Sequence, residues 1–164
     1  MSRGGDRGLL LTRKTILNIL LVGVVVVLLF LSVLLSILPK GGTPGNGSAE
    51  YFEGTVTKIV DGDTLYVDNV KIRLVLVDTP EVGENGFEEA AQFAAGLCPV
   101  GSNATVDQDD DQLYDRYGRM LAVVICGGKN LNEELLEGGH AVILTQYCDE
   151  SEFGSQEWAR EYGC

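Results

Sequence analysis

An uncharged apolar run of 23 residues, Ile16–Leu38, divides this chain into parts that cannot share one hydrophobic core. As a helix the run would be about 34 Å long, enough to cross a hydrocarbon core of about 30 Å. A cleaved signal peptide is the alternative, although its apolar region usually has about 7–15 residues. We predict an uncleaved transmembrane helix at 16–38, so the residues after it must fold as a separate domain.

The cations around this run predict the side of the membrane on which the folded part lies. Four basic residues precede the run in the tail 1–15, whereas Lys40 alone follows closely behind it. Because positively charged flanks stay in the cytoplasm, we expect the tail inside the cell and the rest of the chain outside. The Gly/Pro-rich segment 39–50 has no apolar period and is predicted to be a flexible linker with a reach of about 20 Å.

Residues 51–164 have the length of one ordinary domain and are strongly acidic. Seven lysines and arginines stand against 22 aspartates and glutamates there, which gives a net charge of −15. A solubilising surface adapted to salty surroundings accounts for most of these acids. Strong salt-dependent binding to nucleic acid needs about 6–10 phosphate contacts, so the few cations argue against a tight binder.

All four cysteines of the chain lie in this predicted outer domain, at positions 98, 126, 148 and 164. An even number in an oxidising compartment favours two disulfides over free thiols. Zinc is the alternative, but the spacings are long and no Cys-x-x-Cys pair occurs. Three pairings are open. We favour Cys98 with Cys126, and Cys148 with Cys164, where the second bond would fasten the last helix.

The periodicity of 51–164 predicts a small β-barrel with helices. Three runs alternate as strands do, at 54–60, 65–67 and 70–77, with turn signals between them. A helix is then expected at 87–97, strands at 104–107 and 119–126, a short helix from Asn130, an extended segment at 141–144 and a last helix at 155–162. Five short strands with an inserted helix favour an OB-type five-stranded Greek-key barrel of the α+β class.

Three short segments combine acids and arginines in a way that suits phosphodiester chemistry. They are 60–64 (Val-Asp-Gly-Asp-Thr), 73–81 (Arg-Leu-Val-Leu-Val-Asp-Thr-Pro-Glu) and 115–119 (Asp-Arg-Tyr-Gly-Arg). Carboxylate and carbonyl oxygens are the ligands of Ca²⁺ and Mg²⁺, and the planar guanidinium fits two phosphate oxygens at once. Each segment alone is also typical of an ordinary turn or strand, so the prediction depends on their joint occurrence.

In this order the three segments resemble the staphylococcal nuclease (thermonuclease) family, over residues 51 to about 147. The resemblance implies an OB-type barrel and Ca²⁺-dependent hydrolysis of DNA and RNA that leaves 3′-phosphate ends. Two carboxylates and one backbone carbonyl would be calcium ligands, namely those of Asp63, Asp78 and Thr79. One acid would orient or deprotonate the attacking water and two arginines would hold the phosphate, namely Glu81, Arg73 and Arg119.

The chain departs from the family pattern in two places. The segment after Glu81 is shorter than is common in the family and contains no lysine, and Thr145 stands where the family has an aromatic residue that contacts nucleotide. One geometric condition is also set by the sequence. Arg73 and Asp78 would face opposite sides of a straight strand, so the strand must bend, bulge or end before Asp78.

We therefore expect a membrane-anchored, outward-facing endonuclease that acts on single-stranded or locally melted DNA or RNA, with no obligate protein partner evident. A non-catalytic OB-type module that binds oligonucleotides or a protein partner at the cell surface is the alternative. The scarcity of cations disfavours a binder, and a binding module has no need for the full set of acids.

Overall fold

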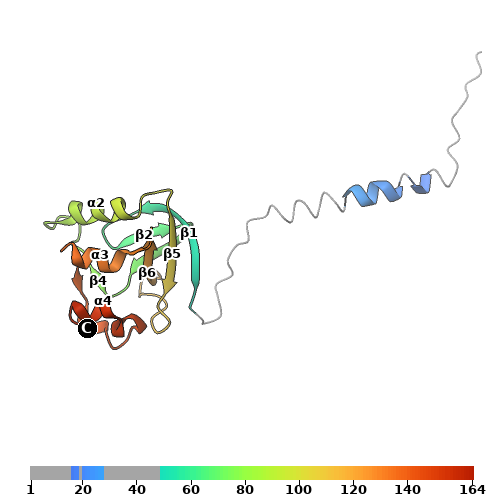
Figure 1. Ribbon diagram of the computed structural model, residues 1–164. Helices are drawn as coiled ribbons and strands as arrows, with labels where there is room; N and C mark the ends of the chain where they lie inside the picture. The colour runs from blue at the N-terminus through green and yellow to red at the C-terminus, as the bar shows by residue number, and fades with distance from the viewer. Residues whose placement is uncertain (1–15, 19, 28–48) are drawn as a thin grey trace, which may run out of the picture. The chain divides into compact units, whose positions relative to one another are not determined.

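The computed structural model describes residues 16–18, 20–27 and 49–164 (Figure 1). Residues 16–18 and 20–27 are helical, and no helix within the described residues is both long and apolar enough to span a bilayer. Much of the predicted anchor 16–38, the tail 1–15 and most of the linker 39–50 lie outside the described residues. The described residues from 49 onward belong to one compact unit.

Five strands of this unit close into a barrel. β1 (Tyr51–Ile59), β2 (Thr64–Val67) and β3 (Val70–Leu74) form an antiparallel meander. β5 (Asn103–Gln108) and β6 (Met120–Cys126) extend the sheet on the other side of β1, and a parallel pairing of β3 with β6 closes it. The predicted five-stranded barrel with helices is thus confirmed for this part of the chain.

Short elements complete the domain around the barrel (Figure 1). They are α2 (Phe87–Leu97), α3 (Leu131–Glu137), α4 (Glu157–Glu161), the short strands β4 (Val77–Asp78), β7 (Lys129–Asn130) and β8 (Val142–Ile143), and the 3-10 turns η1 (Thr145–Tyr147) and η2 (Glu152–Ser155). The helix expected at 155–162 is shorter than predicted, because Gln156 is extended (φ −72°, ψ 154°) and separates η2 from α4.

The third strand also ends earlier than the predicted Val77. β3 stops at Leu74, and Leu76 takes a left-handed conformation with φ of 61°, which costs a residue other than glycine about 1 kcal/mol. The Leu76 carbonyl accepts a hydrogen bond from Leu144 N at 2.8 Å, which holds the turned segment in place. The chain therefore reverses before Asp78, and this meets the geometric condition set by the sequence.

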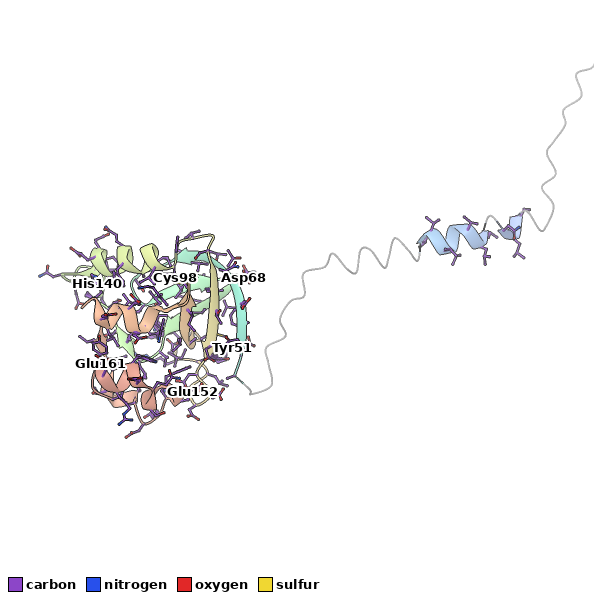
Figure 2. The ribbon with its side chains drawn as sticks, in the orientation of Figure 1. Tyr51, Asp68, Cys98, His140, Glu152 and Glu161 are labelled. Atoms are coloured by element: carbon purple, nitrogen blue, oxygen red, sulfur yellow. A yellow bond between two sulfur atoms is a disulfide. The ribbon has the colours of Figure 1, made fainter. Side chains whose placement is uncertain are left out.

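The core fills the barrel and the space beneath the helices (Figure 2). Two disulfides fasten its edges: Cys98–Cys126 joins the end of α2 to the end of β6, and Cys148–Cys164 joins the residue after η1 to the C-terminal residue. Both predicted pairings are confirmed, and no cysteine among the described residues is free.

Candidate active site

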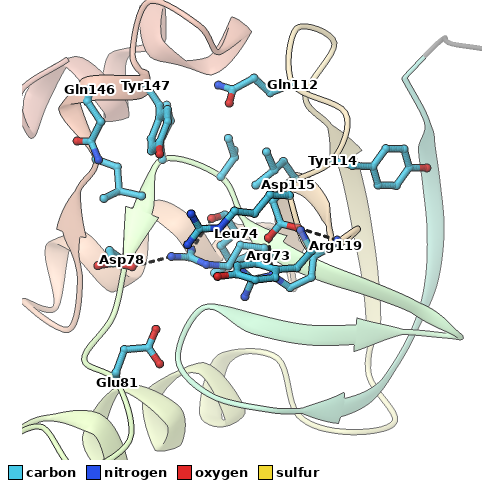
Figure 3. A pocket seen from close by; sticks show the side chains of 16 residues that line it. Arg73, Leu74, Asp78, Glu81, Gln112, Tyr114, Asp115, Arg119, Gln146 and Tyr147 are labelled. Carbon is cyan, nitrogen blue, oxygen red and sulfur yellow. Dashed lines mark hydrogen bonds and ion pairs between the residues drawn. The ribbon is translucent and has the colours of Figure 1, made fainter.

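A cleft of about 560 Å³ opens beside the point where β3 pairs with β6 (Figure 3). Its walls come from β3 and the β3–β4 turn, from the loop 112–119, and from residues 144–147. Four of the six predicted site residues line it, namely Arg73, Asp78, Glu81 and Arg119. The other two, Asp63 and Thr79, are buried and hydrogen-bonded to each other, and Asp63 is ion-paired with Arg73 of the cleft.

Asp63 fixes the turn before β2 to the turn after β4. Its Oδ2 accepts hydrogen bonds from both the N–H and the hydroxyl of Thr79, each at 2.9 Å. Its Oδ1 accepts from the Thr64 hydroxyl at 3.1 Å. Gly62 allows this approach, because a Cβ there would lie 2.8 Å from the Cβ of Ala90 and from the Thr79 side chain.

Arg73 is buried between two carboxylates. Its Nε lies 3.1 Å from Oδ1 of Asp63 and its Nη2 donates to Oδ1 of Asp78 at 2.7 Å. Its Nη1 donates to the carbonyls of Leu74 (2.8 Å) and Val77 (2.5 Å), which fastens the β3–β4 turn. A guanidinium has five N–H groups, so one N–H of Nη2 is left without a partner among the described residues.

Arg119 has more of its donors available. Its Nε donates to Oδ2 of Asp115 at 2.6 Å and its Nη1 to the Thr64 hydroxyl at 3.2 Å, while Nη2 has no hydrogen bond within the described residues. Gly118, with φ of 75°, makes the turn that returns Arg119 toward Asp115. Figure 3 shows Arg73 and Arg119 side by side in the cleft.

Asp115 holds Arg119 as a carboxylate. Burial alone would raise the pKa of Asp115, but hydrogen bonds from the backbone and side chain of Arg119 and from Tyr117 N lower it below its ordinary value. The side chain is therefore ionised at neutral pH, and the guanidinium of Arg119 keeps a charged partner.

Asp78 and Glu81 stand at the open side of the cleft (Figure 3). Burial raises the pKa of Asp78, with smaller contributions from Asp63 and Glu84, and Arg73 opposes the rise. The Asp78 side chain is still 45% exposed, so solvent and ligands reach it. The Glu81 carboxylate makes no hydrogen bond within the described residues, whereas its backbone N–H donates to Glu84 at 2.8 Å.

The carboxylate oxygens of Asp63 and Asp78 and the carbonyl oxygen of Thr79 are of the kind that binds a hard cation, although they are few. The carboxylates of Asp63 and Asp78 both contact the guanidinium of Arg73, which lies between them, and Thr79 follows Asp78 in the same turn. Oxygen donors of this kind are what Ca²⁺ prefers. Among the described residues no group of three or more acidic, histidine or cysteine side chains is arranged to hold a metal ion. The donor types fit a calcium ion, but the Arg73 guanidinium occupies the position between the two carboxylates.

The far end of the cleft contains residues that the sequence did not single out. Gln112, Gln146 and Tyr147 line it, and Nε2 of Gln112 is buried with no hydrogen-bond partner in the described part of the chain. Loop glutamines carry no local signal of function. The family has an aromatic residue at the position of Thr145, and Tyr147 follows two residues later. An aromatic residue so close to that position was the sequence signal that could have pointed to Tyr147. Thr145 itself does not line the cleft.

Comparison with known proteins agrees with this geometry. The profile of the family described as "Staphylococcal nuclease homologue" matches residues 71–161. Endonuclease YncB of Bacillus subtilis is 30% identical over 135 residues, which cover 72% of this chain and 64% of that protein. Endonuclease YhcR of the same species is 33% identical over 124 residues, 65% of this chain and 10% of that protein.

An uncharacterised protein of Bacillus anthracis is 36% identical over 104 residues, 57% of this chain and 48% of its own length. The chain thus spans less than two thirds of each of these three relatives. The matched family region contains β3, β4, β6 and the segment 115–119, and therefore five of the six predicted site residues. This chain belongs to the staphylococcal nuclease homologue family.

Proposed function

We propose that this protein is a Ca²⁺-dependent nuclease that hydrolyses phosphodiester bonds of DNA or RNA and leaves 3′-phosphate ends. One observation carries the proposal: a single cleft is lined by the partly free guanidinium of Arg119, by the ion pair of Arg73 with Asp78, and by the carboxylate of Glu81, which makes no hydrogen bond within the described residues. Two relatives that are named endonucleases support the same conclusion.

The partners of each side chain suggest a division of labour. Arg119 has Nη2 free in the cleft and is the principal phosphate ligand, because developing charge on phosphate oxygens is best met by donors already in position. Arg73 adds one N–H and mainly holds Asp63 and Asp78 in place. The Glu81 carboxylate lines the cleft, makes no hydrogen bond within the described residues and acts as the base, since a base needs to lie within one water of the reacting atom.

Asp78, the Thr79 carbonyl and Asp63 would hold the calcium ion. A calcium ion held by these residues would act as a Lewis acid and supply positive charge against the substrate phosphate. With two carboxylates the affinity is expected to be low, about 10⁻⁴–10⁻³ M as in weak extracellular sites. Asp78 must be ionised for this role, and in the calcium-free protein burial raises its pKa.

The test is cleavage of a labelled single-stranded DNA by the purified full-length chain. We expect cleavage that rises with Ca²⁺ over about 0.1–1 mM and stops with chelator. Glu81→Gln should reduce kcat by about 10²–10³. Glu88→Gln, which removes an exposed acid of α2, is the matched control and should change nothing. Equal cleavage with chelator, or no cleavage at any calcium concentration, would refute the proposal and the second result would favour a binding module.

We also propose that residues 16–38 anchor the domain to the outer face of the cell membrane. The length of the apolar run, the basic tail and two disulfides in the described domain support this arrangement. The full-length chain should sediment with membranes and be digested by protease added to intact cells. Recovery in the soluble fraction, or protection from protease in intact cells, would contradict it.

A further inference from the structure

A row of basic and aromatic side chains crosses the outer face of the barrel outside the cleft. Lys58 on β1 is paired directly with Tyr66 on β2, and Tyr66 is paired directly with Lys71 on β3. Residues opposite each other on neighbouring strands point to the same face. Both lysines are exposed and Tyr66 is half-buried. We call these three residues the basic row.

The sheet geometry fixes this row outside the core. Leu65 and Val67, which flank Tyr66, are buried in the barrel, so Tyr66 faces outward. The ammonium of Lys58 lies 5.9 Å from the centroid of the Tyr66 ring. A nucleic-acid strand bound here would therefore contact an aromatic ring and a cation at the same place.

The basic row continues into the cleft. The next outward-facing pair on β2 and β3 is Thr64 opposite Arg73, two residues or about 7 Å along the strands. The Thr64 hydroxyl accepts a hydrogen bond from Arg119, so this pair belongs to the phosphate-binding part of the cleft. A separation of two strand residues is close to one nucleotide step of an extended single strand.

The charge distribution singles out this face. Residues 51–164 contain seven lysines and arginines, of which three line the cleft and two are in the basic row. The outward-facing positions of β2 and β3 hold no carboxylate, and the acids next to β2 along the chain, Asp61, Asp63 and Asp68, lie in the turns at its two ends. On a domain of net charge −15, a surface strip that has cations and no carboxylate favours contact with a polyanion.

We propose that the basic row binds the nucleic-acid strand next to the scissile phosphate. The inference rests on the proposed nuclease function for its substrate, but the binding site itself does not depend on catalysis. A base can stack on the Tyr66 ring only when it is unpaired, while Lys58 and Lys71 lie one strand spacing, about 5 Å, to either side of Tyr66 and contact the phosphates that flank this base. Duplex DNA would not offer its bases to the ring.

The experiment compares full-length variants on a long single-stranded oligonucleotide and on a small phosphodiester that carries no base and so cannot reach the row. Tyr66→Leu should raise KM for the oligonucleotide about tenfold through lost stacking, with kcat unchanged. Lys58→Ala with Lys71→Ala should raise the same KM and reduce the slope of log affinity against log salt by about 0.7 per lysine. Lys129→Ala, which removes an exposed lysine outside the cleft and the row, is the matched control.

Hydrolysis of the small phosphodiester should be the same in every variant. A change on the small phosphodiester equal to that on the oligonucleotide, or an unchanged KM for the oligonucleotide, would overturn the proposal. Binding of a fluorescein-labelled oligonucleotide in chelator separates this site from catalysis, because it is measured even if nothing is cleaved. Equal affinity of wild type and row variants, or equal affinity for single strand and duplex, would also count against it.

Discussion

Arg73 and Arg119 carry the same charge but have different surroundings, and this difference separates their effects. Arg73 is buried and contacts two carboxylates and two carbonyls, so Arg73→Ala leaves Asp63 and Asp78 facing each other without a cation. Removing one partner of a buried ion pair typically costs about 3–5 kcal/mol. We expect Arg73→Ala to lower the free energy of unfolding by about 3 kcal/mol and to abolish activity.

Arg119→Ala should reduce kcat but lower the free energy of unfolding less than Arg73→Ala does. It removes one ion pair and one hydrogen bond at the edge of the cleft. Loss of one positioned donor to a transition state costs about 10²–10³ in rate. Thermal unfolding and kcat measured on both variants test the distinction. Similar loss of stability in the two proteins would contradict the contacts described for Arg73.

Asp115 gives a second prediction at the scale of single residues. The lowered pKa of Asp115 means that its stabilising contribution is fully present above the ordinary pKa of an aspartate and is lost as pH falls through the lowered value. Asp115→Asn keeps the shape but points an amide donor or a weaker acceptor at Arg119. We expect a loss of about 1–3 kcal/mol at neutral pH. In acid the variant and the wild type should converge in stability, and a constant difference from neutral to strongly acid pH would be inconsistent with this.

At the scale of elements, the turn between β1 and β2 depends on the absence of a side chain at Gly62. A Cβ there would lie 2.8 Å from Ala90 on α2 and equally close to Thr79, so Gly62→Ala must push the turn away from both. Overpacking of this kind costs about 1–3 kcal/mol. Because Asp63 and Thr79 move with the turn, activity should fall as well.

Gly96→Ala is the matched control for Gly62→Ala. Gly96 lies within α2, and an added Cβ there has no heavy atom within 4 Å. The substitution should stabilise the domain by about 0.5–1 kcal/mol, because alanine is the better helix former. Unfolding in denaturant measures both variants. Equal stability of the two would show that the close approach at Gly62 is not limiting.

The elements also show how far local sequence predicts this fold. The barrel strands and α2 follow from alternation, turn signals and helix formers, all of which are local, and α2 has the predicted bounds 87–97. The end of β3 was missed because nothing in the sequence marks Leu76 for a positive φ. That conformation is held by Leu144, which is distant along the chain, and by the Arg73 bonds to the turn.

The candidate site, too, could be predicted in part from local sequence, while the rest of it depends on tertiary contacts. Motif spacing led to six positions, and the fold brings four of them to one cleft with Asp63 and Thr79 directly behind. Their catalytic and metal-binding roles stay predictions. The unequal partners of the two arginines, the free N–H of Gln112 and the place of Tyr147 depend on tertiary contacts between loops, which no local pattern contains.

At the scale of the whole molecule, the excess of acid sets how stability responds to pH. Burial, together with neighbouring carboxylates, raises the pKa of several acidic groups of the domain, namely Asp61, Asp78, Asp107, Glu133 and Glu152. The folded state then binds more protons than the unfolded chain just above the ordinary pKa values of these groups. Stability must therefore fall as pH rises through that window.

Glu133 offers the most direct test. Burial makes the largest contribution to its raised pKa, and Glu134, Glu137, Glu157 and Glu161 on α3 and α4 add to the rise. We expect the Tm of the wild type to increase between pH 7 and about pH 5, where these acids begin to take up protons. About 1 M salt at pH 7 should also raise the Tm, since it shortens the Debye length to about 3 Å.

Glu133→Gln removes the charge without a change of shape, so it should raise the Tm at pH 7 and make it less sensitive to both pH and salt. Glu88→Gln, at an exposed position of α2, removes the same charge away from this cluster and should leave the two responses as they are. Calorimetry on the wild type and the two variants measures these Tm values. If acid between pH 7 and 5 lowers the Tm of the wild type, or if the two glutamines act alike, repulsion between α3 and α4 is not what limits the stability of this domain.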